Sequence, residues 1–305
     1  MTALVVVVGA TGNVGRRLVR RLVDQEIPVR ALTRDAARAR SFMPTEVEIL
    51  EVLLDQAGQV DRALDGGTAV FLACGNGPRQ AELEDAVVQA AARCEVSRLV
   101  KLSSVSAAIE PSSFHRRIEE SIERTGLTYT HLRPSMFMQS LLTLAELPLV
   151  DSGELRLPLG AARIDAVDVR DVADAACHAL VERGDRSEAW ALLGWRLPMQ
   201  TVASVLAQAL GRPIRYVDVS PEQARLEWAE AEIAEPMKNA LAGIFESLRT
   251  MDPVRLRDDL ERAARHPART WADAGTGLGD SNGDWRDLNL LDAMRPRVEL
   301  AAQEL

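Results

Sequence analysis

Lysine is nearly absent from this chain of 305 residues, and cysteine and aromatic residues are scarce. Only Lys101 and Lys238 carry an ammonium side chain, so arginine supplies almost all the positive charge. The net charge of −9 offers no basic surface for a phosphate backbone, which argues against nucleic acid as a partner. The three cysteines, Cys74, Cys94 and Cys177, lack the spacing of a metal site, which favours free thiols in a reducing compartment.

Long hydrophobic runs are missing as well. No window approaches the length that spans a bilayer, so we expect no membrane partner. The first apolar run is short, lacks a basic start and ends in a glycine-rich turn, which is typical of a core strand and not of a targeting segment. These features predict a cytoplasmic protein. No arrangement of His, Cys, Asp and Glu has convincing metal-ligand spacing, so no metal is predicted.

A glycine-rich turn near the N-terminus is the most informative feature that is present. It follows the valine-rich run Leu4–Val8 and precedes 13–24, where apolar residues recur as on one face of a helix. The Gly-x-x-Gly-x-x-Gly spacing suits the tight turn, the close approach to a pyrophosphate and the helix–strand packing of a dinucleotide site. A glycine-rich turn in another α/β fold is the alternative. The residues predicted to bind a cofactor here are Gly9, Thr11, Gly12, Asn13 and Val14, with Gly15 closing the motif.

Strands and helices alternate along the first half of the chain. This alternation predicts a parallel sheet with helices on both faces, which is the α/β class with a doubly wound, Rossmann-type sheet. After the first strand, we expect strands at 28–33, 47–54, 68–73, 98–104 and 127–132, and helices at 80–94 and 114–124.

Ligand sites of such sheets lie at the carboxyl ends of the strands, where the strand order reverses. Residues from several strand ends should therefore converge on one crevice beside the glycine turn. The segments expected there are 33–34, 55, 74–76, 103–106 and 134–137, which include Thr33, Arg34, Asp55, Cys74, Gly75, Asn76, Ser103, Ser104, Pro134 and Phe137.

The second half is less regular, and we expect it to cover the substrate. Short strands are predicted at 154–159, 162–167 and 213–219, helices at 171–181 and 201–210, and a long amphipathic stretch at 221–251. Gly, Asp, Ser and Asn at 275–284 predict a flexible connection. The expected division is a nucleotide-binding Rossmann core at 1–150, a smaller, mostly helical part at 151–274 that also holds further core elements, and a linker and tail at 275–305.

Arg34 follows the second strand, where many NAD-binding enzymes carry an acid. An arginine at this position can pair with a 2′-phosphate through a charge-assisted contact, which favours NADPH/NADP as the cofactor. Asp35 lies next to it and keeps NADH as a second option. A solvated loop arginine is the alternative interpretation.

Five motifs occur in order: Gly9–Gly15, Leu32–Asp35, Val100–Ser104, His115-x-x-x-Glu119 and Gly126–Met138. With them the chain resembles the NmrA-like branch of the atypical short-chain dehydrogenase/reductases, as far as about Val181. This resemblance implies a Rossmann fold and NAD(P)H-dependent reduction of quinones, azo compounds or polycyclic natural products. It also leaves open a redox sensor that binds the nucleotide and catalyses nothing.

The Tyr-x-x-x-Lys pair that short-chain reductases usually use is missing. The chain has two tyrosines, and the residue four positions later is Arg133 after Tyr129 and Ser220 after Tyr216. Hydride transfer to a carbonyl still needs a proton and stabilisation of the developing charge. Groups other than a tyrosine–lysine pair must therefore supply both.

The catalytic candidates at the appropriate strand ends are Ser104 (or Ser103) and His115. Ser104 could donate a hydrogen bond to the carbonyl oxygen, and His115 could deliver or relay a proton near neutral pH. Strand-end capping by the serines and a structural hydrogen bond at the helix start are the alternatives. Glu119 is expected to anchor a loop or a helix end.

These observations predict an NADPH-dependent reductase that transfers hydride to a carbonyl or quinone of a small, polycyclic aromatic substrate. A neighbouring phenol of such a substrate could provide the proton. A non-catalytic NADP(H)-binding sensor that acts through a partner is the second hypothesis, because it would share the nucleotide site. The sequence leaves open whether the chain is a monomer or a homodimer.

Overall fold

The structure is a computed structural model. It describes residues 4–75, 77, 79–142, 150–151, 153–182, 185–230, 235–250, 256–271 and 273. Asn76, which was expected at the crevice, and the predicted tail at 275–305 lie outside the described residues. Among the residues that are described, no helix combines the length and the apolarity needed to span a bilayer.

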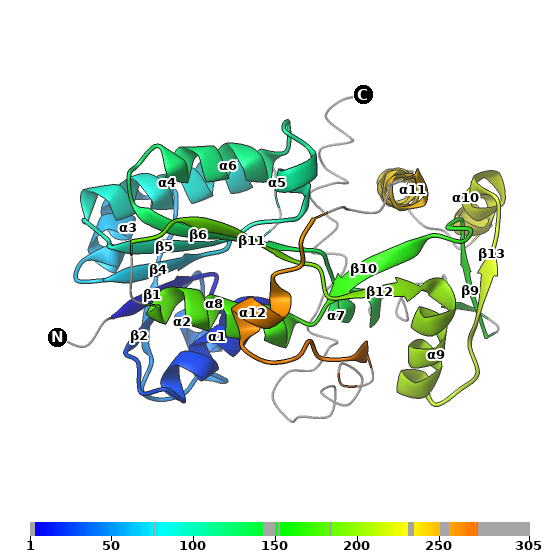
Figure 1. The fold of residues 1–305 in the computed structure, drawn as a ribbon, viewed down its shortest axis with the longest axis horizontal. Helices are drawn as coiled ribbons and strands as arrows, with labels where there is room; N and C mark the ends of the chain where they lie inside the picture. Colours follow the sequence, from blue (N-terminus) through cyan, green and yellow to red (C-terminus); the bar gives the residue numbers. More distant parts are fainter. Residues whose placement is uncertain are drawn as a thin grey trace.

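A seven-stranded sheet, parallel throughout, forms the centre of the larger lobe (Figure 1). Its order is β11-β6-β5-β4-β1-β2-β3. The strands after β1 are added on one side of it as far as β3, and β4 then pairs with its other side, so the strand order reverses between β1 and β4. The predicted Rossmann-type sheet is confirmed. Its strands are β1 (Val5–Val8), β2 (Val29–Thr33), β3 (Glu48–Glu51), β4 (Ala69–Leu72), β5 (Arg98–Leu102), β6 (Thr128–Pro134) and β11 (Glu188–Leu192).

The valine run of β1 explains why helices cover both faces. Val5 and Val7 pack into one hydrophobic cluster, and Val6 and Val8 pack into another on the opposite face, because successive side chains of a strand alternate. In Figure 1, α1 (Asn13–Val23), α2 (Ala36–Arg40), α8 (Val169–Val181) and α12 (Leu260–Ala264) lie on one side of the sheet. The other side carries α3 (Ala57–Leu64), α4 (Gln80–Arg93), α5 (Ser106–Ile109) and α6 (Phe114–Glu123).

A second lobe is built on its own hydrophobic cluster, which includes Leu155, Ile164, Trp228 and Phe245. Two three-stranded sheets accompany its helices. Its strands are β7 (Met136–Phe137), β8 (Val150–Asp151), β9 (Glu154–Leu157), β10 (Arg163–Val167), β12 (Trp195–Pro198) and β13 (Arg215–Asp218). Its helices are α7 (Met138–Leu142), α9 (Met199–Leu210), α10 (Pro221–Glu230) and α11 (Glu235–Thr250).

Most predicted elements occur, with ends shifted by a few residues, and four differences matter. The strand expected at 47–54 is limited to β3, which has a neighbour on one side only. The stretch at 221–251 contains two helices, α10 and α11. The short helices α2 and α3 were not predicted. Nor was β11, whose Glu-Ala-Trp-Ala-Leu sequence lacks the β-branched residues typical of strands.

Candidate active site

The glycine turn joins β1 to α1 at the point where the strand order reverses. Gly9 has φ +77°, and a Cβ there would lie 2.1 Å from the carbonyl oxygen of Ala73. A Cβ on Gly15 would lie 2.1 Å from the carbonyl oxygen of Gly9. The fold itself therefore requires glycine at both positions, the first for its backbone conformation and both for close packing.

Gly12 differs from the other two glycines. It is exposed and extended, with φ −76°, and the nearest atom to an added Cβ is the Gly9 oxygen at 3.2 Å. No side chain caps the start of α1, whose N-cap residue is Gly12. A solvent-exposed glycine beside helix N–H groups that no described side chain caps fits the pyrophosphate of a dinucleotide. Of the flanking predicted residues, Thr11 is exposed and Asn13 half-buried, whereas the Val14 side chain is in the core.

The end of β2 holds a cation that the described residues do not neutralise. Arg34 is exposed, and no hydrogen bond or ion pair joins its guanidinium to any residue that the structure describes. Asp35 instead caps α2, because its Oδ1 accepts the N–H of Arg38 at 2.9 Å. Thr33 Oγ1 accepts the N–H of Asp35 at 3.1 Å, which fixes this turn. The arginine is thus available to a ligand, and the neighbouring acid is engaged in its own helix.

A buried ion pair between α4 and β5 holds the loop that follows β4. Glu84 of α4 and Lys101 of β5 are fully buried, with Lys101 Nζ 3.0 Å from Glu84 Oε1. The same Oε1 accepts the N–H of Cys74 at 3.1 Å. Burial raises the pKa of the Cys74 thiol to about 12. The thiol is therefore neutral near pH 7 and is not a candidate nucleophile.

Two other predicted residues near this loop are open to solvent. Gly75 is exposed, and no contact within 4 Å is found for a Cβ added there among the residues that the structure describes. Asp55 is also exposed, and its Oδ2 lies 3.2 Å from Nη1 of Arg79. These residues stand at the same edge of the sheet as the glycine turn, because all the strands are parallel.

Glu119 connects the ends of β5 and β6 from the helix above them. It is fully buried, and its Oε1 accepts the hydroxyl of Ser103 at 2.7 Å. Arg133 donates to both of its oxygens, at 2.9 Å from Nε and 2.6 Å from Nη2. Burial opposes ionisation, but the bonds from Arg133 and Ser103 hold the pKa of Glu119 below its usual value. Glu119 thus anchors the strand ends, and the Ser103 hydroxyl is engaged.

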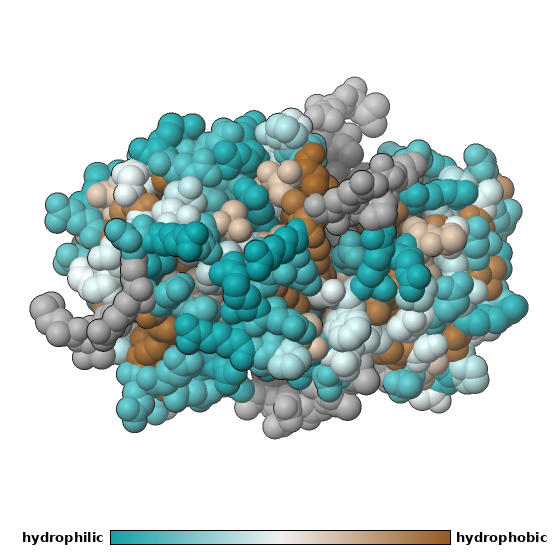
Figure 2. Space-filling view, viewed as in Figure 1, coloured by the Kyte–Doolittle hydropathy of each residue, from teal (hydrophilic) through white to brown (hydrophobic). Residues whose placement is uncertain are grey.

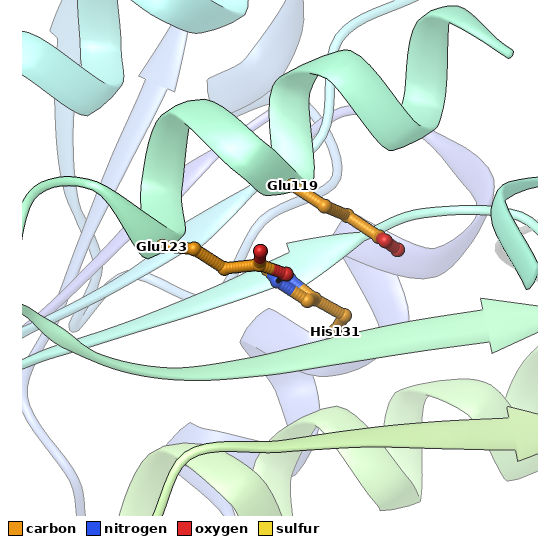
Figure 3. Close-up of side chains that lie close together, drawn as sticks. All are labelled: Glu119, Glu123 and His131. Carbon is orange, nitrogen blue, oxygen red and sulfur yellow. Dashed lines mark ion pairs between the residues drawn. The ribbon is translucent and has the colours of Figure 1, made fainter. Parts of the chain in front are cut away.

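Figure 3 shows Glu119 and Glu123 pointing from α6 toward His131 of β6. One polar atom from each lies within 4.8 Å of the others, which is the proximity of a metal site. However, Arg116 binds Glu123 through two hydrogen bonds of 2.7 and 3.0 Å, and Arg133 binds Glu119. Two arginines already balance the two carboxylates, so a cation would add uncompensated buried charge.

A second group of possible metal ligands consists of Asp171, Asp174 and His266. The guanidinium of Arg269 already donates to both aspartates and balances their charge. The absence of a metal stays a prediction.

Ser104 differs from Ser103 in what its hydroxyl does. Its Oγ accepts the N–H of Ser106 at 3.2 Å, which leaves its own O–H to donate elsewhere. Ser106 Oγ lies 3.2 Å from Oγ of Ser113, the residue that precedes α6. His115, on the first turn of α6, is half-buried. This line of serines leads from the end of β5 to the start of the helix that carries His115.

Pro134 and Phe137 lie where β6 passes into the second lobe. Pro134 is buried, and its carbonyl accepts the N–H of Val105 at 2.9 Å. Phe137 is half-buried against the core cluster of the larger lobe. Figure 2 shows a mostly hydrophilic surface in which hydrophobic side chains gather in a band between the two lobes.

Neither tyrosine is prepared for acid–base work. The Tyr216 hydroxyl donates to main-chain oxygens in the second lobe, including that of Leu157 at 3.2 Å, and burial raises its pKa to about 12. Tyr129 stacks on His131 with ring centroids 4.4 Å apart, and burial raises its pKa. A catalytic tyrosine is expected to have a lowered pKa, so both side chains are better explained as structural.

Sequence reasoning missed Glu84 and Lys101, which hold the loop after β4 in place. A signal was present for each: Glu84 shares a helix face with Val87 and Val88, and Lys101 lies within a buried strand. A charge on an otherwise apolar face predicts a buried partner.

Comparison with known proteins agrees with this geometry. The chain is 31% identical over 279 residues to an NAD(P)H azoreductase from Xenophilus azovorans, covering 88% of this chain and 96% of that protein. It is 32% identical over 277 residues, with the same two coverages, to a (4-alkanoyl-5-oxo-2,5-dihydrofuran-3-yl)methyl phosphate reductase from Streptomyces griseus.

Solved structures share the fold at lower identity. One is the Citrobacter triphenylmethane reductase complexed with NADP(H), with a TM-score of 0.78 and 20% identity over 90% of this chain and 99% of that one. Another is the NADPH-dependent quinone oxidoreductase of Escherichia coli complexed with NADPH, with a TM-score of 0.77 and the same identity and coverages. The model of the NmrA-like family matches residues 1–266, and the chain belongs to this family.

Proposed function

We propose that this chain is an NADPH-dependent reductase that acts on a carbonyl or quinone of a small aromatic substrate. The observation that carries the proposal is the pairing of an exposed glycine, Gly12, with an Arg34 that the described residues do not neutralise, at one edge of the sheet. Gly12 leaves room for a pyrophosphate, and Arg34 offers a guanidinium to a 2′-phosphate. The names of the two reductases that are 31% and 32% identical support the reductase over the sensor.

A bound reduced nicotinamide supplies a hydride, and the protein must stabilise the negative charge that develops on the acceptor oxygen. Ser104 is the candidate donor, because its O–H donates to none of the described residues, whereas that of Ser103 is given to Glu119. His115 is the candidate proton source at the start of α6. The hydrophobic band between the lobes supports an aromatic substrate (Figure 2).

Binding measurements test the nucleotide site. Arg34→Ala should weaken NADPH binding by about 1.5–3 kcal/mol through loss of charged hydrogen bonds, and it should spare NADH. Arg38→Ala is the matched control, because Arg38 is an exposed arginine on the following helix. Equal losses for both nucleotides would remove the phosphate role from Arg34.

Single-turnover reduction of a panel of aromatic quinones, polycyclic ketones and azo dyes tests the enzyme. Ser104→Ala should slow hydride transfer by roughly a hundredfold, as removal of an oxyanion donor does elsewhere. His115→Ala should lower the single-turnover rate strongly if the imidazole is the proton source. Tyr129→Phe should keep most of the wild-type rate. NADPH binding without turnover on any acceptor would favour the sensor instead.

A further inference from the structure

Glu51 places a negative charge beside the residue that would recognise a 2′-phosphate. In the parallel register of β2 and β3, Glu51 is the partner of Thr33, which directly precedes Arg34. The N–H of Val52 donates to the carbonyl oxygen of Thr33 at 2.8 Å, so the two strand ends are held together. The Glu51 carboxylate therefore lies at the same strand ends as the Arg34 backbone.

The Glu51 side chain reaches across to the start of α2. Its Oε2 accepts the N–H of Ala36, two residues after Arg34, at 3.1 Å. The other acid nearby, Asp35, directs its carboxylate to the N–H of Arg38 within its own helix. Glu51 thus occupies a main-chain donor two residues from Arg34, and its charge would repel a phosphate bound to Arg34.

We propose that Glu51 is a specificity-determining residue that opposes Arg34, a proposal that rests on the nucleotide site proposed above. Arg34 attracts the 2′-phosphate of NADPH, and Glu51 weakens that attraction and withholds the Ala36 N–H. NADH has no phosphate at this position, so Glu51 leaves its affinity unchanged. The balance of the two residues keeps the site open to both nucleotides.

Dissociation constants of NADPH and NADH for the full chain, measured by nucleotide fluorescence, test this. Glu51→Gln should tighten NADPH binding by about threefold to tenfold, since an exposed charge acts on a phosphate through water, and NADH should stay within about twofold. The gain should shrink when ionic strength is raised, because salt screens exposed charges. Glu51→Asp keeps the charge and should retain the wild-type ratio of affinities.

Glu48→Gln is the matched control. Glu48 is an exposed glutamate at the other end of β3, where it pairs with Arg30 at 2.8 Å, so its loss should change neither affinity. An unchanged NADPH to NADH ratio in Glu51→Gln, or an equal change for both nucleotides, would overturn the role of Glu51 and leave the proposed function intact. Failure of both nucleotides to bind the wild-type chain would overturn both.

Discussion

At the residue scale, the glycines of the turn separate structural from ligand-binding requirements. Gly15 is fixed by its neighbours, since an added Cβ would lie 2.1 Å from the Gly9 oxygen. Gly12 is constrained less, since its φ is negative and an added Cβ would lie 3.2 Å from the Gly9 oxygen, a tight contact but a milder one than at Gly15. We attribute the rest of the need for glycine at position 12 to the proposed nucleotide.

Substitutions at these two glycines should have opposite signatures. Gly12→Val should abolish nucleotide binding and leave the thermal midpoint within a few degrees of wild type, because its side chain fills the space of the pyrophosphate. Gly15→Ala should lower the free energy of unfolding by about 1–3 kcal/mol through overpacking. Calorimetric titration and thermal unfolding distinguish the two. Wild-type affinity in Gly12→Val would place the nucleotide elsewhere.

His131 should make the stability of the fold depend on pH. It is 1% exposed, and burial lowers its pKa from 6.5 to about 4, although Glu119 and Glu123, whose Oε1 lies 3.5 Å from Nε2, favour the charged ring. A lowered histidine pKa means that the unfolded chain binds the proton more readily, so stability falls as pH drops below 6.5. The free energy of unfolding should decrease by about 2 kcal/mol from pH 7 to 5 on account of this group.

Denaturant titrations of wild type and His131→Gln across this range provide the measurement, and the comparison of the two proteins removes the contribution of carboxylates that they share. The variant should be less stable at pH 7 and should show a shallower slope with pH. Parallel pH profiles for the two proteins would contradict the assignment to His131.

At the element scale, one buried ion pair fixes three elements. Glu84 of α4 binds Lys101 of β5 and the N–H of Cys74 after β4, and Gln80 donates to it at 3.3 Å. The pair therefore positions the loop after β4, at the edge of the sheet that carries the glycine turn. Full burial makes the loss of one partner costly, because the other charge would stay in the core without compensation.

Glu84→Gln and Lys101→Met should each destabilise the protein by about 3–5 kcal/mol. The double variant should cost less than the sum of the two, because no buried charge is left unpaired. Chemical denaturation of the three proteins measures the coupling. Additive losses would mean that the two residues act independently.

At the scale of the whole molecule, residues 256–271 join the two lobes, and we call them the C-terminal strap. The strap binds the edge strand β11, where the N–H of Asp259 donates to the Ala191 oxygen at 2.8 Å. Arg269 then pairs with Asp171 of α8, and its carbonyl accepts the indole N–H of Trp195 in the second lobe at 3.0 Å. One residue of the strap thus contacts both lobes.

Arg269→Met should destabilise the protein by about 3–5 kcal/mol, because Asp171 is fully buried. Burial already raises the pKa of Asp171 against the opposing bonds from Arg269, so removal of the arginine should raise this pKa further. Hydrogen exchange of the strap should also increase. Arg262→Met is the control, since that half-exposed arginine pairs with Glu188 and should cost less than about 1 kcal/mol. Equal losses in the two variants would contradict the bridging role.

The sequence by itself determined the α/β class, the glycine turn and the set of strand ends. These are local properties: a valine run buried on both faces, a glycine spacing and an arginine directly after a strand can be recognised from neighbours in the chain. The lack of a Tyr-x-x-x-Lys pair is equally local. For this reason the Rossmann-type sheet was predicted correctly, although β11 was not.

Only the tertiary structure decided how these residues are engaged, because their partners are distant in the chain. Ser103 and Ser104 are equivalent in sequence, and Glu119 from another element occupies the hydroxyl of Ser103. The Asp35 carboxylate accepts a hydrogen bond from α2. The register of β3 with β2 pairs Glu51 with Thr33, the residue before Arg34. Hydrogen bonds and charge pairs between separate elements depend on packing geometry, which no local pattern encodes.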